Sequence, residues 1–162
     1  MRSRLGMLLF VVLLFSVSAQ AQSSPLVGTW KLNVAKSKYS PGPPAKSGAT
    51  TITAVPDGIR LVNDGVNAQS QATHLEYTAK LDGKDNLQKS TIDGKLDPNA
   101  ADTIAWKKID DYTYESTTKR KGQVLTTTHY TITKDGKTRT NSVTGKNAQG
   151  QAVNNTQVYE KQ

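Results

Sequence analysis

Short runs of alternating polar and apolar residues cover most of the chain after residue 21. Alternation with a period of two residues is typical of β-strands that bury one face. The runs are separated by turn pairs such as Asp64-Gly65, Asp82-Gly83 and Asp135-Gly136, which favour the left-handed backbone that tight hairpins need. No segment of helical length shows the 3.6-residue period of an amphipathic helix. The pattern therefore predicts an all-β chain built from hairpins.

Ten strands are predicted, joined mostly by short turns into an antiparallel up-and-down meander. They cover residues 26–33, 50–55, 59–63, 71–81, 87–92, 103–109, 112–119, 124–133, 137–144 and 152–160. Closing such a meander into a barrel removes the exposed edges that invite aggregation, and a barrel of this size has room for a small ligand. We therefore expect a ten-stranded antiparallel up-and-down β-barrel. Residues 40–45 are rich in proline, which predicts a stiff surface loop preceded by at most one helical turn.

The first 21 residues have the layout of a secretory signal peptide. Arg2 and Arg4 precede an apolar run over residues 5–15, and small residues follow as far as Ala21. We expect cleavage after Ala21, with residues 22–162 forming a single barrel domain. The apolar run is shorter than the roughly 20 residues of a spanning helix, so we expect no stable membrane insertion after cleavage. The mature protein is expected to be exported, either to a periplasm or out of the cell.

Composition narrows the classes of function. The 162 residues include no cysteine, which excludes disulfides, thiolate catalysis and zinc sites built on sulfur. The formal net charge is +8, but the lysines are dispersed along the chain. A dispersed positive charge is typical of a solubilising surface, so we expect no nucleic-acid partner and a monomer.

The sequence also lacks the patterns of catalytic and metal sites. His74 and His129 do not belong to a metal-ligand spacing. Asp110 and Asp111 are adjacent carboxylates, but their place at a predicted hairpin favours turn formation over acid–base chemistry. Neither a phosphate-binding glycine motif nor a Gly-x-Ser-x-Gly elbow occurs. We therefore expect no enzyme activity, no metal and no cofactor.

Alternation places several aromatic residues inside the predicted barrel. Tyr112 and Tyr114 share one face of their strand, and Tyr130 shares the inner face of the next strand with Val124, leaving His129 outside. The resulting interior mixes Tyr, Trp and Thr with a few aliphatic residues. It is more polar than a dry core, so its hydroxyls must either pair across strands or line a wet cavity.

The candidate ligand-binding residues share an expected inward orientation, and the alternative for each aromatic is core packing. They are Tyr77, Trp106, Tyr112, Tyr114, Tyr130, Arg139, Gln157 and Tyr159. Gln157 and Tyr159 form the best polar pair, with an ordinary strand pair as the alternative. Arg139 would supply a positive charge inside the barrel, with a surface position as its alternative.

The two ends of the expected domain resemble the calycins, the group of lipocalins and intracellular fatty-acid-binding proteins. The expected domain carries Gly28-Thr29-Trp30-Lys31-Leu32 near its start and Gln157-Val158-Tyr159-Glu160-Lys161 near its end. The resemblance implies that Trp30 lies across the closed end of the barrel and that Gly28 permits a close approach beside it.

Fatty-acid-binding proteins carry an arginine where this chain has Gln157, and that arginine helps to hold the fatty-acid carboxylate with the nearby tyrosine. Glutamine brings no charge, and a charge-assisted hydrogen bond is about twice as strong as a neutral one. The family also has two lid helices where this chain has its proline-rich loop, which implies a more open mouth. The chain further resembles exported bacterial lipocalin-like proteins of unknown function, through residues 28–33, 40–44 and 158–161.

These features support two hypotheses about function. The first is an exported lipocalin-like protein that binds a small amphipathic or apolar ligand in the barrel lumen. The alternative is an envelope protein-interaction or inhibitor module, whose barrel is filled by its own side chains and whose loops bind a protein or polymer.

Overall fold

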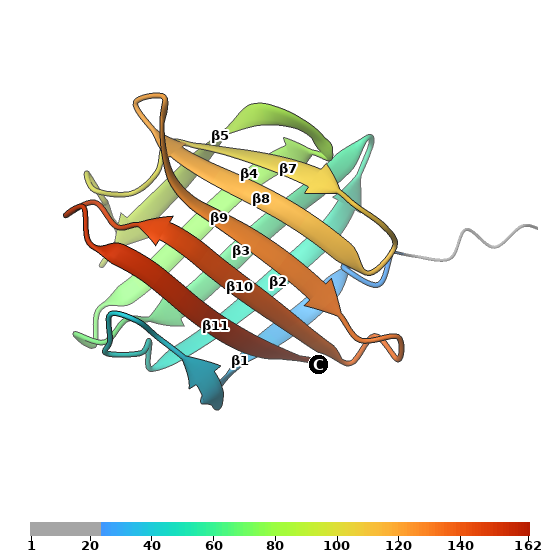
Figure 1. The fold of residues 1–162 in the computed structure, drawn as a ribbon, viewed down its shortest axis with the longest axis horizontal. Coiled ribbons are helices and arrows are strands. Elements are labelled where there is room, and N and C mark those ends of the chain that lie inside the picture. Colours follow the sequence, from blue (N-terminus) through green and yellow to red (C-terminus); the bar gives the residue numbers. More distant parts are fainter. Residues whose placement is uncertain (1–23) are drawn as a thin grey trace, which may run out of the picture.

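The structure is a computed structural model that describes residues 24–162, so the predicted signal peptide lies outside the described residues. This part of the chain is all β (Figure 1). Its strands are β1 (Gly28–Lys38), β2 (Ser47–Val55), β3 (Gly58–Val66), β4 (Ala72–Lys80), β5 (Asp82–Ile92), β6 (Lys95–Leu96), β7 (Thr103–Lys108), β8 (Thr113–Arg120), β9 (Gln123–Ile132), β10 (Thr138–Lys146) and β11 (Ala152–Lys161). Within residues 24–162 there is no helix with the length and hydrophobicity to cross a membrane.

Ten of these strands close into a single antiparallel barrel. The strand order is β4-β3-β2-β1-β11-β10-β9-β8-β7-β5, and β4 also pairs with β5, which completes the ring. The two-residue strand β6 adds only a short hairpin to the end of β5. Each strand otherwise lies beside its neighbours in sequence, and β1 pairs with β11. The predicted ten-stranded up-and-down barrel is confirmed.

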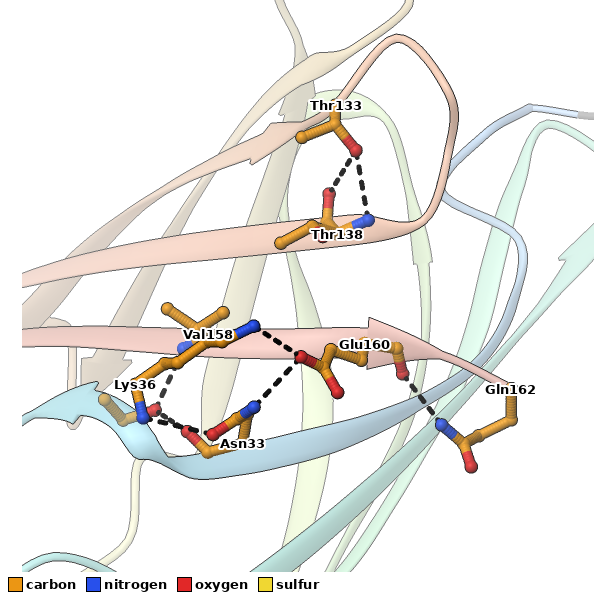
Figure 2. Close-up of polar contacts among 8 residues, drawn as sticks. Asn33, Lys36, Thr133, Thr138, Val158, Glu160 and Gln162 are labelled. Atoms are coloured by element: carbon orange, nitrogen blue, oxygen red, sulfur yellow. Dashed lines mark hydrogen bonds and ion pairs between the residues drawn. The ribbon is translucent and has the colours of Figure 1, made fainter.

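A polar cluster on the outside of the barrel joins the first strand to the last (Figure 2). Glu160 Oε1 accepts hydrogen bonds from Asn33 Nδ2 and Lys36 Nζ, each at 2.9 Å. Ser37 Oγ donates to Asn33 O at 2.7 Å and accepts from Val158 N at 3.0 Å. These bonds span the register shift between Asn33 and Lys38, so side chains hold the seam where the backbone ladder is irregular. β1 thus continues to Lys38, beyond the predicted end at residue 33 and in place of a helical turn.

The end of the barrel where β1 begins is filled by side chains. Trp30 and Leu26 are fully buried, and Trp30 Nε1 donates to Leu26 O at 2.9 Å. Lys161 Nζ lies 5.0 Å from the centre of the Trp30 ring and donates to Pro25 O at 3.1 Å. Gly28 has φ +135°, and a Cβ there would lie 2.6 Å from Lys161 Cε. Glycine at this position therefore lets Lys161 pass over the backbone to the indole.

The hydrophobic core occupies the same half of the barrel. Its fully buried members include Leu26, Trp30, Ile52, Trp106 and Tyr114. The β1–β2 loop and the β8–β9 and β10–β11 turns lie at the opposite end (Figure 1). Inward-facing residues there, such as Leu75, Val143 and Asn155, are only half-buried. The barrel is therefore packed at one end and open at the other, and we call the open end the mouth.

One of the predicted inward positions is wrong. Val124 is 57% exposed, because the register between β8 and β9 shifts between Thr118 and Lys119 and places Val124 opposite Lys119. This β-bulge reverses the alternation of the strand, which the odd or even position of a residue in the sequence does not reveal. Tyr112 precedes β8 and packs half-buried against the core.

Candidate functional site

The open half of the barrel contains a cavity of about 240 Å³. Its walls are formed by Thr50, Leu61, Asn63, Leu75, Tyr77, Gln88, Ile104, Ser116, Thr118, Thr128, Tyr130, Arg139, Asn141, Gln157 and Tyr159. This set contains polar, aromatic and aliphatic side chains and one cation, but no carboxylate. The cavity therefore combines the apolar surface and the few convergent polar groups of a small-molecule site.

Arg139 is the charged group of this site. It lies on β10, paired with Ile132 on one side and Tyr159 on the other, and its side chain points into the lumen. Only 1% of its surface is exposed. Its guanidinium carbon lies 4.5 Å from the ring centre of Tyr159, 5.1 Å from that of Trp30 and 6.0 Å from that of Tyr130. Three aromatic faces thus stabilise the cation where water does not reach it.

The Arg139 charge has no anionic partner within residues 24–162. Its Nε and Nη1 atoms are buried and donate no hydrogen bond. Burial lowers the pKa of Arg139, but an arginine side chain in a protein stays protonated. Burial also raises the pKa values of Tyr77, Tyr130 and Tyr159, so these phenols are neutral at physiological pH. The cavity therefore presents an uncompensated positive charge.

Several amide side chains line the same cavity as Arg139. Asn63 Oδ1 accepts a hydrogen bond from Thr50 Oγ1 at 2.7 Å. Gln88 Nε2 donates to Ala101 O at 3.0 Å, whereas Gln88 Oε1 is buried without a partner. Asn141 Oδ1 is buried without a partner as well. Buried polar atoms are seldom left unpaired, so these two oxygens mark positions where a ligand can donate hydrogen bonds.

An aromatic cluster supports the wall beneath the cavity. Trp106 stacks on Tyr130, with ring centres 4.4 Å apart and an interplanar angle of 24°, and meets Tyr114 edge-on at 6.5 Å. Trp106 Nε1 donates to Tyr77 Oη at 3.1 Å, and Tyr130 Oη bonds to Ser116 Oγ at 2.9 Å. These contacts fix the orientation of the phenols that face the cavity.

The structure brings five of the predicted site residues to the cavity wall, namely Tyr77, Tyr130, Arg139, Gln157 and Tyr159. Trp106 and Tyr114 are buried beside it in the core, and Tyr112 lies near the closed end. The sequence analysis missed Gln88 and Asn141. Asn141 carries a signal in the sequence, because it lies two residues after Arg139 and therefore on the same face of β10.

Tyr39 is a further residue that the sequence analysis did not select. It follows β1 at the mouth, and its hydroxyl is buried without a hydrogen-bond partner, close to Gln157 and Tyr159. Burial is the main cause that raises its pKa. Tyr39 thus brings a neutral hydroxyl from the β1–β2 connection to the side of the barrel where Gln157 lies.

The arrangement can hold an anion and hydrogen-bond a polar group beside it. Among the described residues, no group of three or more His, Cys, Asp or Glu side chains is placed to hold a metal ion. No protein-family model matches the chain, and no curated protein matches it. The closed ten-stranded barrel is consistent with the calycin resemblance of the two chain ends.

Proposed function

We propose that this protein binds a small amphipathic molecule in the barrel lumen and that an anionic group of that molecule pairs with Arg139. The observation that carries the proposal is the burial of the Arg139 guanidinium beside a cavity with no carboxylate in its wall. Removing a charge from water costs several kcal/mol unless a partner compensates it. A bound anion would supply that partner through charge-assisted hydrogen bonds to Nε and Nη1.

The apolar part of the ligand would contact the aliphatic wall formed by Leu61, Leu75 and Ile104. A cavity of about 240 Å³ lies below the range of about 300–1,000 Å³ that is usual for drug-sized ligands. The ligand is therefore either small or has a tail that extends through the mouth. In this proposal Arg139 supplies the positive charge that fatty-acid-binding proteins have at the position of Gln157.

We further propose that the mature protein is exported and acts as a lipocalin-like carrier, in line with the signal-peptide pattern and the calycin resemblance. A chain isolated from the envelope or medium that begins at Gln22 would support export. The lumenal cavity favours a carrier over the alternative of an interaction module with a filled barrel.

Calorimetric titration with decanoate and with the uncharged decanol tests the proposed function. Decanoate should bind the wild-type protein, and decanol should bind more weakly because it leaves Arg139 without a counter-charge. Arg139→Met should weaken decanoate binding by about 30-fold or more, since a buried charge pair is typically worth at least about 2 kcal/mol. Arg60→Met, at an exposed arginine on β3, is the matched control and should bind like the wild type. Equal affinity of wild type and Arg139→Met for decanoate would refute the proposal.

A further inference from the structure

Two buried hydrogen-bond acceptors near Arg139 have no donor among the described residues. The Gln88 amide is held in one orientation, because its nitrogen donates to the Ala101 carbonyl, which can only accept. Its oxygen therefore remains the free group, and it is buried without a partner. Asn141 is 6% exposed, and its buried oxygen is also unpartnered. A ligand that offers only an anion would satisfy Arg139 and leave both amide oxygens unpaired.

Other polar groups of the wall are paired. Thr50 donates to the amide oxygen of Asn63, and Ser116 pairs with the Tyr130 hydroxyl. Among the buried acceptor oxygens of the cavity wall, those of Gln88 and Asn141 lack a donor within residues 24–162. A buried acceptor without a donor costs free energy, and a ligand that supplies the donor removes this cost.

The order of these groups along the barrel defines the order of groups on a ligand. β10 runs from the packed end to the mouth, so Asn141 lies nearer the mouth than Arg139 by two residues, or about 7 Å at the usual rise of a strand. Both residues face the same cavity. A ligand whose anion reaches Arg139 would therefore place its next few atoms beside Asn141.

We infer that the ligand carries a hydrogen-bond donor, a hydroxyl or an amide N–H, a few bonds from its anionic group, and that this donor binds one of the two free oxygens, that of Asn141 or that of Gln88. The inference rests on the proposed function and narrows its ligand class to hydroxy acids and N-acyl amino acids. The two classes share a carboxylate, a nearby donor and an apolar tail. A plain fatty acid lacks the donor.

Titration calorimetry with four probes tests the inference: decanoate, each enantiomer of 3-hydroxydecanoate, and N-octanoylglycine. At least one donor-bearing probe should bind the wild-type protein roughly 3- to 10-fold more tightly than decanoate, which corresponds to one net hydrogen bond. Whichever of the hydroxy acid and the acylglycine binds more tightly shows whether the ligand's donor is a hydroxyl or an amide N–H. If Asn141 accepts the donor hydrogen, Asn141→Leu should reduce the affinity ratio of that probe to decanoate to about one, with both affinities measured on the same variant.

Two further variants keep the result interpretable. If Gln88 is the acceptor instead, Gln88→Met should remove the preference, and full preference in both folded variants would overturn the assignment of the donor to these oxygens. Asn154→Leu makes the same substitution at an exposed position of β11 and should retain the full preference. If decanoate binds through Arg139 but no donor-bearing probe binds more tightly, the inference is overturned and the proposed function stands. If no probe binds the folded wild-type protein, both are overturned.

Discussion

Burial of the Arg139 charge destabilises the folded state, and no acidic group within residues 24–162 lies close enough to compensate it. Its guanidinium is buried, and its neighbours are neutral phenols and an indole. Cation–π contacts recover part of the lost hydration, at up to about 2 kcal/mol for a desolvated contact. A residue that is unfavourable for stability and favourable for binding is typical of functional sites.

Replacing Arg139 by methionine should therefore leave the protein at least as stable as the wild type. Well-packed apolar residues that replace buried charges are often neutral or stabilising by about 1–4 kcal/mol. Chemical denaturation followed by circular dichroism, in the absence of ligand, measures the free energy of unfolding. A loss of more than about 2 kcal/mol would mean that Arg139 is chiefly a structural residue. Arg60→Met, which breaks only an exposed ion pair with Glu76, should change stability by less than about 1 kcal/mol.

At the scale of the strands, closure of the barrel depends on the pairing of β1 with β11. The ladder between them is interrupted between Asn33 and Lys38, and the Glu160 carboxylate connects the two strands at that point (Figure 2). The hydrogen bond from Lys36, followed by that from Asn33, lowers the pKa of Glu160 below its ordinary value of 4.5. The ionised form is therefore the one that the folded state favours.

The lowered pKa of Glu160 predicts how the stability of the protein depends on pH. Because the pKa of Glu160 is lower in the folded state than in the unfolded state, its contribution is present above about pH 4.5 and is lost as pH falls through the folded-state value. Glu160→Gln should lower the melting temperature at pH 7, and the difference from the wild type should shrink as pH falls below 4.5. Thermal melts at a series of pH values measure this. Glu115→Gln, on the outer face of β8, is the control, and a pH-independent effect of Glu160→Gln would contradict the assignment.

Turn chemistry and alternation were sufficient to predict most of the strands. Asp-Gly pairs and their relatives mark hairpins because few other residues adopt the required backbone, and residues of alternating polarity fill the space between them. One exception is Asp64-Gly65, a predicted turn that instead lies inside β3 and pairs with His74 and Thr73 of β4. The others are register shifts. The bulge opposite Thr118 exposes Val124, and the irregular end of β1 extends that strand to Lys38. Neither was predicted, because an extra residue in one strand does not change the polarity pattern of the strand that pairs with it.

At the scale of the whole molecule, alternation put Arg139 on the same face as Asn141 but did not decide between the lumen and the surface, nor whether the charge is paired. Whether a lumenal arginine is paired depends on the residues that nine other strands bring to it, and no local pattern contains that information. The same holds for Gln88, whose free oxygen follows from a hydrogen bond to Ala101 across a strand pair. The sequence thus predicted the barrel and several residues of the cavity wall. The unpaired charge of Arg139 and the unpaired amide oxygens could be recognised only from the three-dimensional structure of the lumen.

The charge distribution around the mouth bears on how an anionic ligand would arrive. Arg120 and Lys121 at the β8–β9 turn and Lys146 at the end of β10 line a surface groove of about 380 Å³ that has no acidic residue in its wall. None of the three forms an ion pair within the described part of the chain, although Asp102 accepts a hydrogen bond from the Lys121 backbone. Such a cluster creates a local positive potential that attracts anions over distances set by ionic strength.

Charge at the mouth should therefore control the rate of association more than the lifetime of the complex. A triple variant with Arg120, Lys121 and Lys146 changed to glutamine should bind an anionic ligand roughly 3- to 10-fold more slowly at about 10 mM ionic strength, with little change in dissociation rate. The difference should nearly vanish at about 150 mM, where the Debye length falls to about 8 Å. Stopped-flow measurement of both rate constants checks this. The matched control changes Lys107, Lys134 and Lys137, near the packed end, to glutamine and removes the same net charge. If that control slows association equally, the net charge of the protein rather than the position of the mouth cations attracts the ligand.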